Sequence, residues 1–166
     1  MRNTRTLSVI ALIGAAVSMS ACVSMSRSSS VTALDPAAAA GMRVSEIRLT
    51  TDDKVTVRPE FAGIFRAHVQ TKLDGCATGT RPLRLEASIS RFDRANPAQV
   101  LLIGGANVLR GRARLVDPAN GRVVAEYEIG RTIVGSRLGV FQMAESEEQL
   151  SDAFGSELCE QAFKAD

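Results

Sequence analysis

Hydrophobic positions recur every three or four residues between Phe61 and Leu73, the clearest periodic pattern in the chain. This spacing places them in one stripe along a helix. The stripe consists of Phe61, Ile64, Phe65, His68, Val69 and Leu73. Pro59 fits the first helical turn, where its missing N–H costs nothing, and Gly75 is expected to end the helix in a left-handed conformation. The pattern predicts an amphipathic helix from Pro59 to Gly75.

A second helix is predicted from Ser146 to about Phe163. Ser146 opens a Ser-Glu-Glu-Gln run that has the form of a capping box. Apolar residues then follow at helical spacing: Leu150, Ala153, Phe154 and Leu158. The acidic residues of this helix are expected to complement the helix dipole and to form a solvated face. They are Glu147, Glu148, Asp152 and Glu157.

Alternation of apolar and polar residues, typical of half-buried strands, appears on both sides of the first helix. Residues 43–50 alternate weakly and residues 83–89 strongly. Because a helix lies between them, these two strands are expected to be parallel, with a right-handed crossover. Val100–Ile103 is a short apolar run that could add another strand.

Two further alternating runs, 107–116 and 122–129, flank the segment Asp117-Pro118-Ala119-Asn120-Gly121 and predict a β-hairpin. With this segment as a five-residue loop, Leu115 faces Val123, and apolar residues face one another along one side. A two-residue turn would instead place Leu115 against an acidic residue. Since register depends on which side is buried, the five-residue loop is favoured.

The same register pairs opposite charges on the polar side of the hairpin, Arg112 with Glu126 and Arg110 with Glu128. On the apolar side, Tyr127 is expected to cover Gly111. The segment Gly130–Met143 follows the hairpin and is glycine-rich and apolar. It is expected to extend the strand through Val134 and then to turn.

The predicted fold is a two-layer α/β sandwich in the order strand, helix, strand, strand, strand, helix. A mixed sheet of four strands, or five with Val100–Ile103, carries both helices on one face. The other face is expected to be solvated or covered by a partner, and it carries Arg110, Arg112, Glu126 and Glu128.

The first 21 residues have the features of a bacterial signal peptide. Arg2 and Arg5 precede an apolar or small-residue run from Leu7 to Val17, which is too short to span a bilayer. The closing Met-Ser-Ala-Cys resembles the lipobox of bacterial lipoproteins, which implies that Cys22 is acylated and becomes the first residue of the mature protein. Ordinary cleavage nearby and an uncleaved anchor are the alternatives.

Removal of residues 1–21 leaves 145 residues of the 166, enough for one domain. Residues 22–41 are rich in Ser and Ala and show no periodic pattern, so they are expected to form a flexible tether from lipidated Cys22 to a single domain at 42–166. Val23 stands where lipoproteins retained in the inner membrane usually carry Asp. The expected location is the periplasmic face of the outer membrane.

Charge and composition exclude nucleic acid as a partner. Arg2 and Arg5 leave with the signal peptide, so the mature chain keeps 18 of the 20 basic residues against 18 acidic ones and has no net charge. With six Phe, one Tyr and no Trp, it also lacks the aromatic residues that stack on bases. The core must consist mostly of Val, Leu, Ile and Ala.

Two thiols remain if Cys22 carries lipid, Cys76 and Cys159. An exported protein folds in an oxidising compartment, where an even number of cysteines favours a disulfide. Two buried free thiols are the alternative.

No catalytic or metal-binding constellation and no cofactor motif is found in the sequence. The three cysteines are widely separated and His68 is the only histidine, so a metal site is not expected. His68 lies on the apolar stripe of the first helix and is expected to be a satisfied histidine at the edge of the core. Gly104-Gly105 precedes a strand, whereas a phosphate-binding loop precedes a helix. An enzyme is therefore not expected.

The chain resembles small uncharacterised α/β lipoproteins of Gram-negative bacteria. The features that carry this resemblance are the lipobox, the short linker, the strand, the helix that ends near a cysteine and the strand–turn–strand unit of residues 107–129. The pattern is similar to YajG-like lipoproteins and, more distantly, to the curli-secretion lipoprotein and to LpoB, an activator of penicillin-binding proteins. This resemblance implies an anticodon-binding-like or TolB-N-like sheet with helices on one side. It also implies a binding role in envelope assemblies.

The expected function is a non-catalytic binding or assembly module of the cell envelope, attached to the membrane by its N-terminal lipid. A small-ligand or lipid carrier is the alternative. The expected contacts with an envelope protein lie in the glycine-rich segment, at Val134, Leu138, Val140 and Phe141. These four side chains could instead cap the core.

Overall fold

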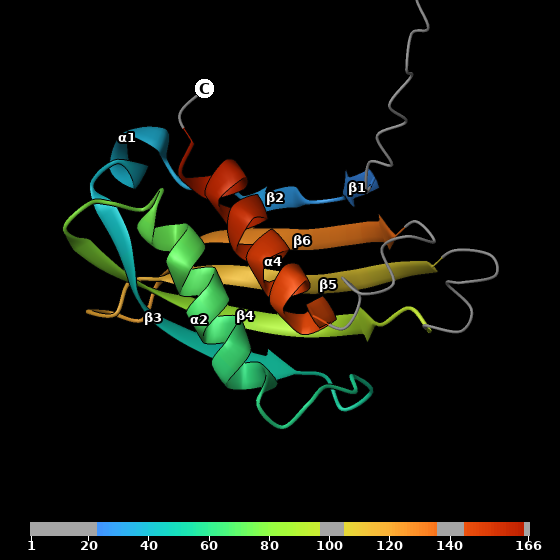
Figure 1. Cartoon of the computed structure of the whole chain (residues 1–166). Coiled ribbons are helices and arrows are strands. Elements are labelled where there is room, and N and C mark those ends of the chain that lie inside the picture. Colours follow the sequence, from blue (N-terminus) through green and yellow to red (C-terminus); the bar gives the residue numbers. More distant parts are fainter. Residues whose placement is uncertain (1–22, 97–104, 136–144, 165–166) are drawn as a thin grey trace, which may run out of the picture.

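A mixed six-stranded sheet forms one layer of the protein, and α2 and α4 cover one of its faces (Figure 1). The structure is a computed structural model that describes residues 23–96, 105–135 and 145–164. The strands are β1 (Val23–Ser26), β2 (Ser29–Thr32), β3 (Met42–Thr51), β4 (Arg81–Asp93), β5 (Gly105–Val116) and β6 (Val123–Gly135). The helices are α1 (Pro36–Ala39), α2 (Phe61–Asp74) and α4 (Ser146–Ala162). The predicted two-layer α/β arrangement is confirmed.

From β3 onward the elements follow the predicted order. β3 and β4 are parallel and joined through α2, and β4, β5 and β6 are antiparallel neighbours. The strands lie side by side as β1-β6-β5-β4-β3, and β2 also pairs with β6. The described sheet therefore has six strands where four or five are predicted, because two short strands precede β3. The proposed strand at Val100–Ile103 lies outside the described residues.

The segment predicted to be a flexible tether is part of the fold. β1 and β2 both pair antiparallel with β6, and Leu34 and Ala39 are buried in the core. Asp35 caps α1, with its carboxylate accepting hydrogen bonds from two backbone N–H groups. The prediction is wrong because strand pairing along an edge uses backbone groups, which leave a weak pattern in the sequence.

The β5–β6 hairpin has the predicted faces but a different register. Leu115 pairs with Ala125 instead of Val123, because the loop is one residue longer than predicted, so that Val116 pairs with Val123, and a bulge at Val124 adds one more residue. A shift by two positions keeps every side chain on its predicted side. The shift places Tyr127 opposite Ala113 and Ile129 opposite Gly111. The prediction that Tyr127 covers Gly111 is therefore wrong.

Both long helices begin near the predicted positions, with different ends. α2 starts at Phe61, two residues after Pro59, and ends at Gly75 in the right-handed helical region (φ −81°), so the predicted left-handed cap is wrong. Ser146 lies inside α4, and the side chain of Glu145 at the cap position makes no capping hydrogen bond. The predicted capping box is therefore absent from this helix.

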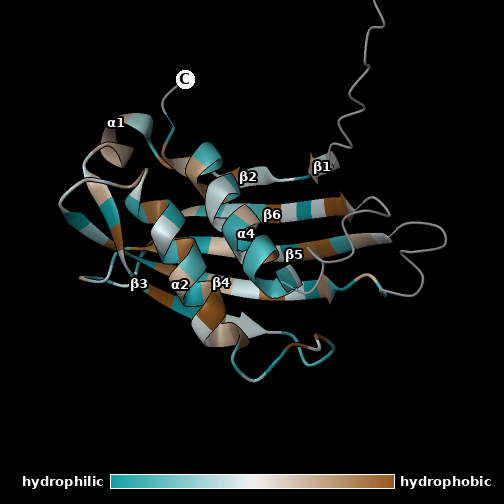
Figure 2. Ribbon diagram, viewed as in Figure 1, coloured by the Kyte–Doolittle hydropathy of each residue, from teal (hydrophilic) through white to brown (hydrophobic). Residues whose placement is uncertain are grey.

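The core lies between the helices and the sheet and is mostly aliphatic, with three phenylalanine contacts. The ring centroids of Phe65 and Phe154 are 5.1 Å apart and join α2 to α4. Phe61 packs against Phe92 at 5.4 Å and joins α2 to β4. Figure 2 shows hydrophobic residues alternating with hydrophilic ones along the strands, as expected for a sheet with one covered face.

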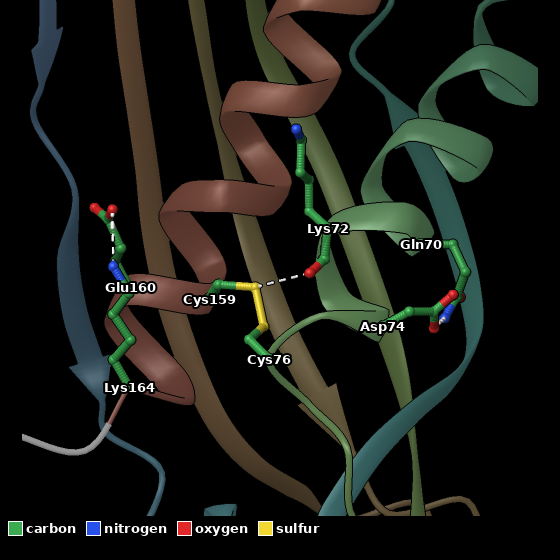
Figure 3. The surroundings of a disulfide bond; sticks show 7 residues. All are labelled: Gln70, Lys72, Asp74, Cys76, Cys159, Glu160 and Lys164. Atoms are coloured by element: carbon green, nitrogen blue, oxygen red, sulfur yellow. Dashed lines mark hydrogen bonds and ion pairs between the residues drawn. A yellow bond between two sulfur atoms is a disulfide. The ribbon is translucent and has the colours of Figure 1, made fainter.

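A disulfide links the ends of the two long helices. Cys76 follows α2 and Cys159 lies in α4, with their Cα atoms 5.9 Å apart (Figure 3). This is the bridge predicted from the cysteine count, and the Cα separation is within the usual range. It fixes the helix layer at one end.

Candidate functional site

The face of the sheet that the helices leave uncovered, called the outer face, carries a network of alternating charges. Arg112 of β5 pairs with Glu126 (3.2 Å) and Glu128 (3.4 Å) of β6. Arg114 pairs with Glu126 and with Glu86 of β4, both at 3.7 Å. The predicted pairing of Arg112 with Glu126 thus exists as a diagonal contact. The predicted pairing of Arg110 with Glu128 is wrong, because the register shift places Arg110 opposite Gly130.

Two shallow hollows open on the outer face and share Ser88 and Arg112. One has a volume of about 350 Å³, and Arg27, Ser90 and Arg110 also line it. The other has a volume of about 440 Å³. Both are open, and most of the residues that line them are charged or carry a hydroxyl group, so they suit contacts with a surface better than an enclosed apolar ligand.

Two arginines of the outer face have no acidic partner among the described residues. Arg27 lies between β1 and β2, and its backbone N–H donates to the Gly130 carbonyl at 2.8 Å. Arg110 of β5 is paired with Gly130 in the sheet. Glycine at this position leaves room for the backbone at Arg27, since a Cβ would come within 3.0 Å of the Arg27 carbonyl oxygen. Both arginines line the same hollow.

Buried carboxylates on α4 hold segments from elsewhere in the chain. Glu157 is 3% exposed, accepts a hydrogen bond from the Ser26 hydroxyl (2.5 Å) and pairs with Arg131 of β6 (2.8 Å). Glu147 is 1% exposed and pairs with Arg58 (2.8 Å) and Arg94. For these two residues the predicted solvated face is wrong, because arginines distant in sequence neutralise them inside the fold.

The remaining predicted helix residues are closer to the surface. Arg58 also donates a hydrogen bond to Glu148. Desolvation alone would raise the pKa of the Glu148 carboxyl, but the hydrogen bond from Arg58 outweighs it and the pKa is lowered. His68 is half-buried, and its Nδ1 lies 3.1 Å from the Asp152 carboxylate. Lys72 lies 3.7 Å from the same carboxylate. His68 is thus a satisfied histidine between α2 and α4.

Another, larger hollow lies between α1 and the C-terminal end of α4. Its volume is about 510 Å³, and Leu34, Ala39, Phe163 and Lys164 are among the residues that line it. In the described ranges, no group of three or more His, Cys, Asp or Glu side chains is arranged to hold a metal ion. No helix within those ranges is long and apolar enough to cross a bilayer.

The structure describes some of the residues predicted for the site. Val134 is the last residue but one of β6, lies on the outer face and is 38% exposed. Cys22, Leu138, Val140 and Phe141 lie outside the described residues. Met25 and Arg27 were not predicted, although the alternation in Ser24-Met25-Ser26-Arg27-Ser28 is a strand pattern that could have indicated them.

No protein-family model matches the sequence, and a search of curated proteins gives no match. Among solved structures, the fold is similar to that of PelC from Paraburkholderia phytofirmans, a dodecamer, with 16% identity and a TM-score of 0.52 over 84% of this chain and 99% of PelC. A substituted form of that dodecamer gives 14% identity and a TM-score of 0.52 over 86% of this chain and all (100%) of the PelC chain.

The fold is also similar to that of protein XCC0632 from Xanthomonas campestris, a DUF330 protein. The identity is 14% and the TM-score 0.51, over 76% of this chain and 87% of XCC0632. At these identities the likenesses show a shared fold. The resemblance to YajG-like lipoproteins, the curli-secretion lipoprotein and LpoB stays a prediction.

Proposed function

We propose that this chain is a lipoprotein acylated at Cys22 on the periplasmic face of the outer membrane, where it acts as a non-catalytic binding or assembly module. The signal-peptide features of residues 1–22 support this cellular location. The Cys76–Cys159 disulfide is in keeping with an oxidising compartment.

The observation that carries the binding role is the uncovered outer face. Six strands form this sheet layer, and α2 and α4 cover only its other face (Figure 1). Its charges alternate in sign between neighbouring strands, as in the pair Arg112 and Glu128 (3.4 Å). Such a pattern selects a partner of complementary charge and sets its register more than it adds affinity.

A second copy of this chain is the first partner to consider. PelC, which has the same fold, is a dodecamer. An alternating row of Arg and Glu can meet another such row with opposite charges aligned, because each copy supplies both signs. We propose that the outer face serves either such self-assembly or the docking of another envelope protein.

Photo-crosslinking in cells tests the proposal with the full-length chain. A photoreactive amino acid at Ser88, exposed at the centre of the outer face, is expected to give discrete crosslinked protein bands. The matched control is the same amino acid at Arg66, which is exposed on α2. Charge reversal by Arg112→Glu should weaken the Ser88 crosslinks. Equal crosslinking from both positions, or none from either, would contradict docking through the outer face.

A small-ligand or lipid carrier is the second candidate, favoured by the hollow of about 510 Å³ beside Leu34 and Phe163. Native mass spectrometry of the purified protein distinguishes the two candidates. A stoichiometric lipid or small molecule, in the absence of a crosslinked protein, would support the carrier.

A further inference from the structure

The chain joins the sheet directly after the cysteine that we propose to be acylated, so this inference rests on the proposed function. Val23 follows Cys22, is the first residue of β1 and pairs with Val134 of β6. Consecutive Cα atoms are about 3.8 Å apart, so an acyl chain on Cys22 would be attached one residue from the start of β1. The hydrogen bond from Ser26 to Glu157 (2.5 Å) holds β1 in place. No spacer separates the lipid from the folded sheet.

Toward this end of the sheet the outer face changes from charged to apolar. Alternation along β5 places Ala106 and Val108 on the same side as the arginines of that strand. The register places Thr132 and Val134 of β6 beside them, and Met25 of β1 pairs with Thr132. Figure 2 shows hydrophobic residues at the end of β6 that lies next to β1. We call the following four residues the apolar patch: Met25, Ala106, Val108 and Val134.

The apolar patch holds two of the most exposed large hydrophobic side chains among the described residues. Met25 is 48% exposed and Val134 is 38% exposed. The third such residue, Val31, is 58% exposed and belongs to β2. It lies near Tyr127, about 20 Å along β6 from Val134. Exposed apolar side chains therefore gather where the chain meets Cys22.

Arg27 and Arg110 stand at the boundary between the apolar patch and the charged network. Both flank Gly130 and, within the part of the chain that the structure describes, neither forms an ion pair. Asp93, the acidic residue beside the apolar patch, is already paired with Arg91 at 2.5 Å. The boundary therefore presents two uncompensated positive charges.

We propose that the apolar patch rests on the membrane surface and that Arg27 and Arg110 bind lipid phosphates. Apolar side chains at the depth of the acyl boundary with arginines at headgroup level are the arrangement of interfacial membrane contacts. The guanidinium fork matches phosphate oxygens. A membrane is favoured over a protein partner because the acyl chain begins one residue from β1. The contact replaces the protein contact predicted for Val134.

Reporter positions test this contact in the acylated full-length protein, purified and placed in vesicles of phosphatidylethanolamine and phosphatidylglycerol. Cys22 is acylated and the other two native cysteines are bridged, so a new cysteine is the free thiol that takes a fluorescent label. We choose Met25→Cys and Val134→Cys, with Val31→Cys as the matched exposed control. Labels at the first two positions should be quenched by brominated acyl chains and be several-fold less accessible to aqueous iodide than the control.

Neutral variants test the arginines through the same Val134 label. Arg27→Gln combined with Arg110→Gln should raise iodide access to the label several-fold. The matched control combines Arg81→Gln and Arg122→Gln, two exposed arginines at the opposite end of the sheet that also have no ion pair among the described residues. This control should leave iodide access unchanged.

Three results would overturn the membrane contact. In the first, labels at Met25 and Val134 are as accessible to iodide as the Val31 label. In the second, these labels are shielded from iodide but are not quenched by brominated lipid. In the third, the two arginine double variants have the same effect on iodide access to the Val134 label. The second result would indicate a protein on the apolar patch. Mass spectrometry of the same samples reports the acyl group on Cys22 separately, so loss of acylation points to failure of the proposed function instead.

Discussion

The hydroxyl of Tyr127 accepts a hydrogen bond from the backbone N–H of Leu34 at 2.8 Å, across 93 residues of sequence. Both residues are buried, so this bond fixes the N-terminal segment to β6 inside the protein. Tyr127→Phe removes the acceptor, keeps the ring and leaves a buried N–H without a partner. We expect a loss of about 1–3 kcal/mol in the free energy of unfolding, measured by urea denaturation. Hydrogen exchange should also accelerate near Leu34, and an unchanged midpoint would contradict the assignment.

Alkaline pH should destabilise the protein through the same residue. Desolvation raises the pKa of Tyr127 above its ordinary value of 10.0, although the hydrogen bond from Leu34 opposes the effect. The folded state then holds the proton more tightly than the unfolded state, so the contribution of Tyr127 to stability is complete below pH 10 and falls as pH rises through the folded pKa. Tyrosinate absorbance reports this single tyrosine. Tyr127→Phe should remove this part of the pH dependence, and titration of Tyr127 at its ordinary pKa would contradict the prediction.

The Cys76–Cys159 disulfide should contribute about 2–4 kcal/mol to the free energy of unfolding, because it closes a long loop with a sequence separation of 83. The double variant Cys76→Ser, Cys159→Ser is compared with the wild type by denaturant unfolding. Reduced wild type provides the control and should match the variant. Two reactive thiols in the oxidised wild-type protein would show that the bridge is absent.

Glu157→Ala should release β1 from the helix layer. The substitution leaves Arg131 without its partner and removes the acceptor for Ser26, with an expected cost of about 3–5 kcal/mol. Hydrogen exchange in residues 23–32 should rise more than in β4 and β5. Glu160→Ala is the matched control, because its pair with Lys164 is exposed and should change stability by no more than about 0.5 kcal/mol. Equal effects of the two variants would argue against this role for Glu157.

Metabolic labelling with a palmitate analogue tests the anchor. The wild type should carry label, and Cys22→Ala should lose it together with retention in the membrane fraction. Equal labelling of the two proteins would refute acylation at Cys22.

Much of the fold could be predicted from local patterns. The stripe from Phe61 to Leu73 corresponds to α2, and alternation located β4, β5 and β6. The hairpin register could not be derived in the same way, because one extra loop residue and the bulge at Val124 together move β6 by two residues without changing which side chains face the core.

The candidate site was only partly predictable, since its members come from separate parts of the chain. The charged outer face followed from alternation around Arg112. The burial of Glu147 and Glu157 depends on Arg58 and Arg131, which the fold brings to them from a loop and a strand. Arg27 takes its place at the outer face only because β1 and β2 pair with β6, and that pairing relies on backbone groups.

The placement of β1 determines when the fold of the protein is completed. β1 is the first strand to emerge during synthesis, yet Glu157, which binds Ser26, comes 131 residues later. The hydrogen bond from Ser26 therefore cannot form until almost the whole chain has been made. Contacts so distant in sequence form slowly compared with those of a helix or a hairpin. On the proposed function, the end of the protein attached to the membrane would consequently be the last to become structured, and a chain cut short before α4 would lack the carboxylate that holds its first strand.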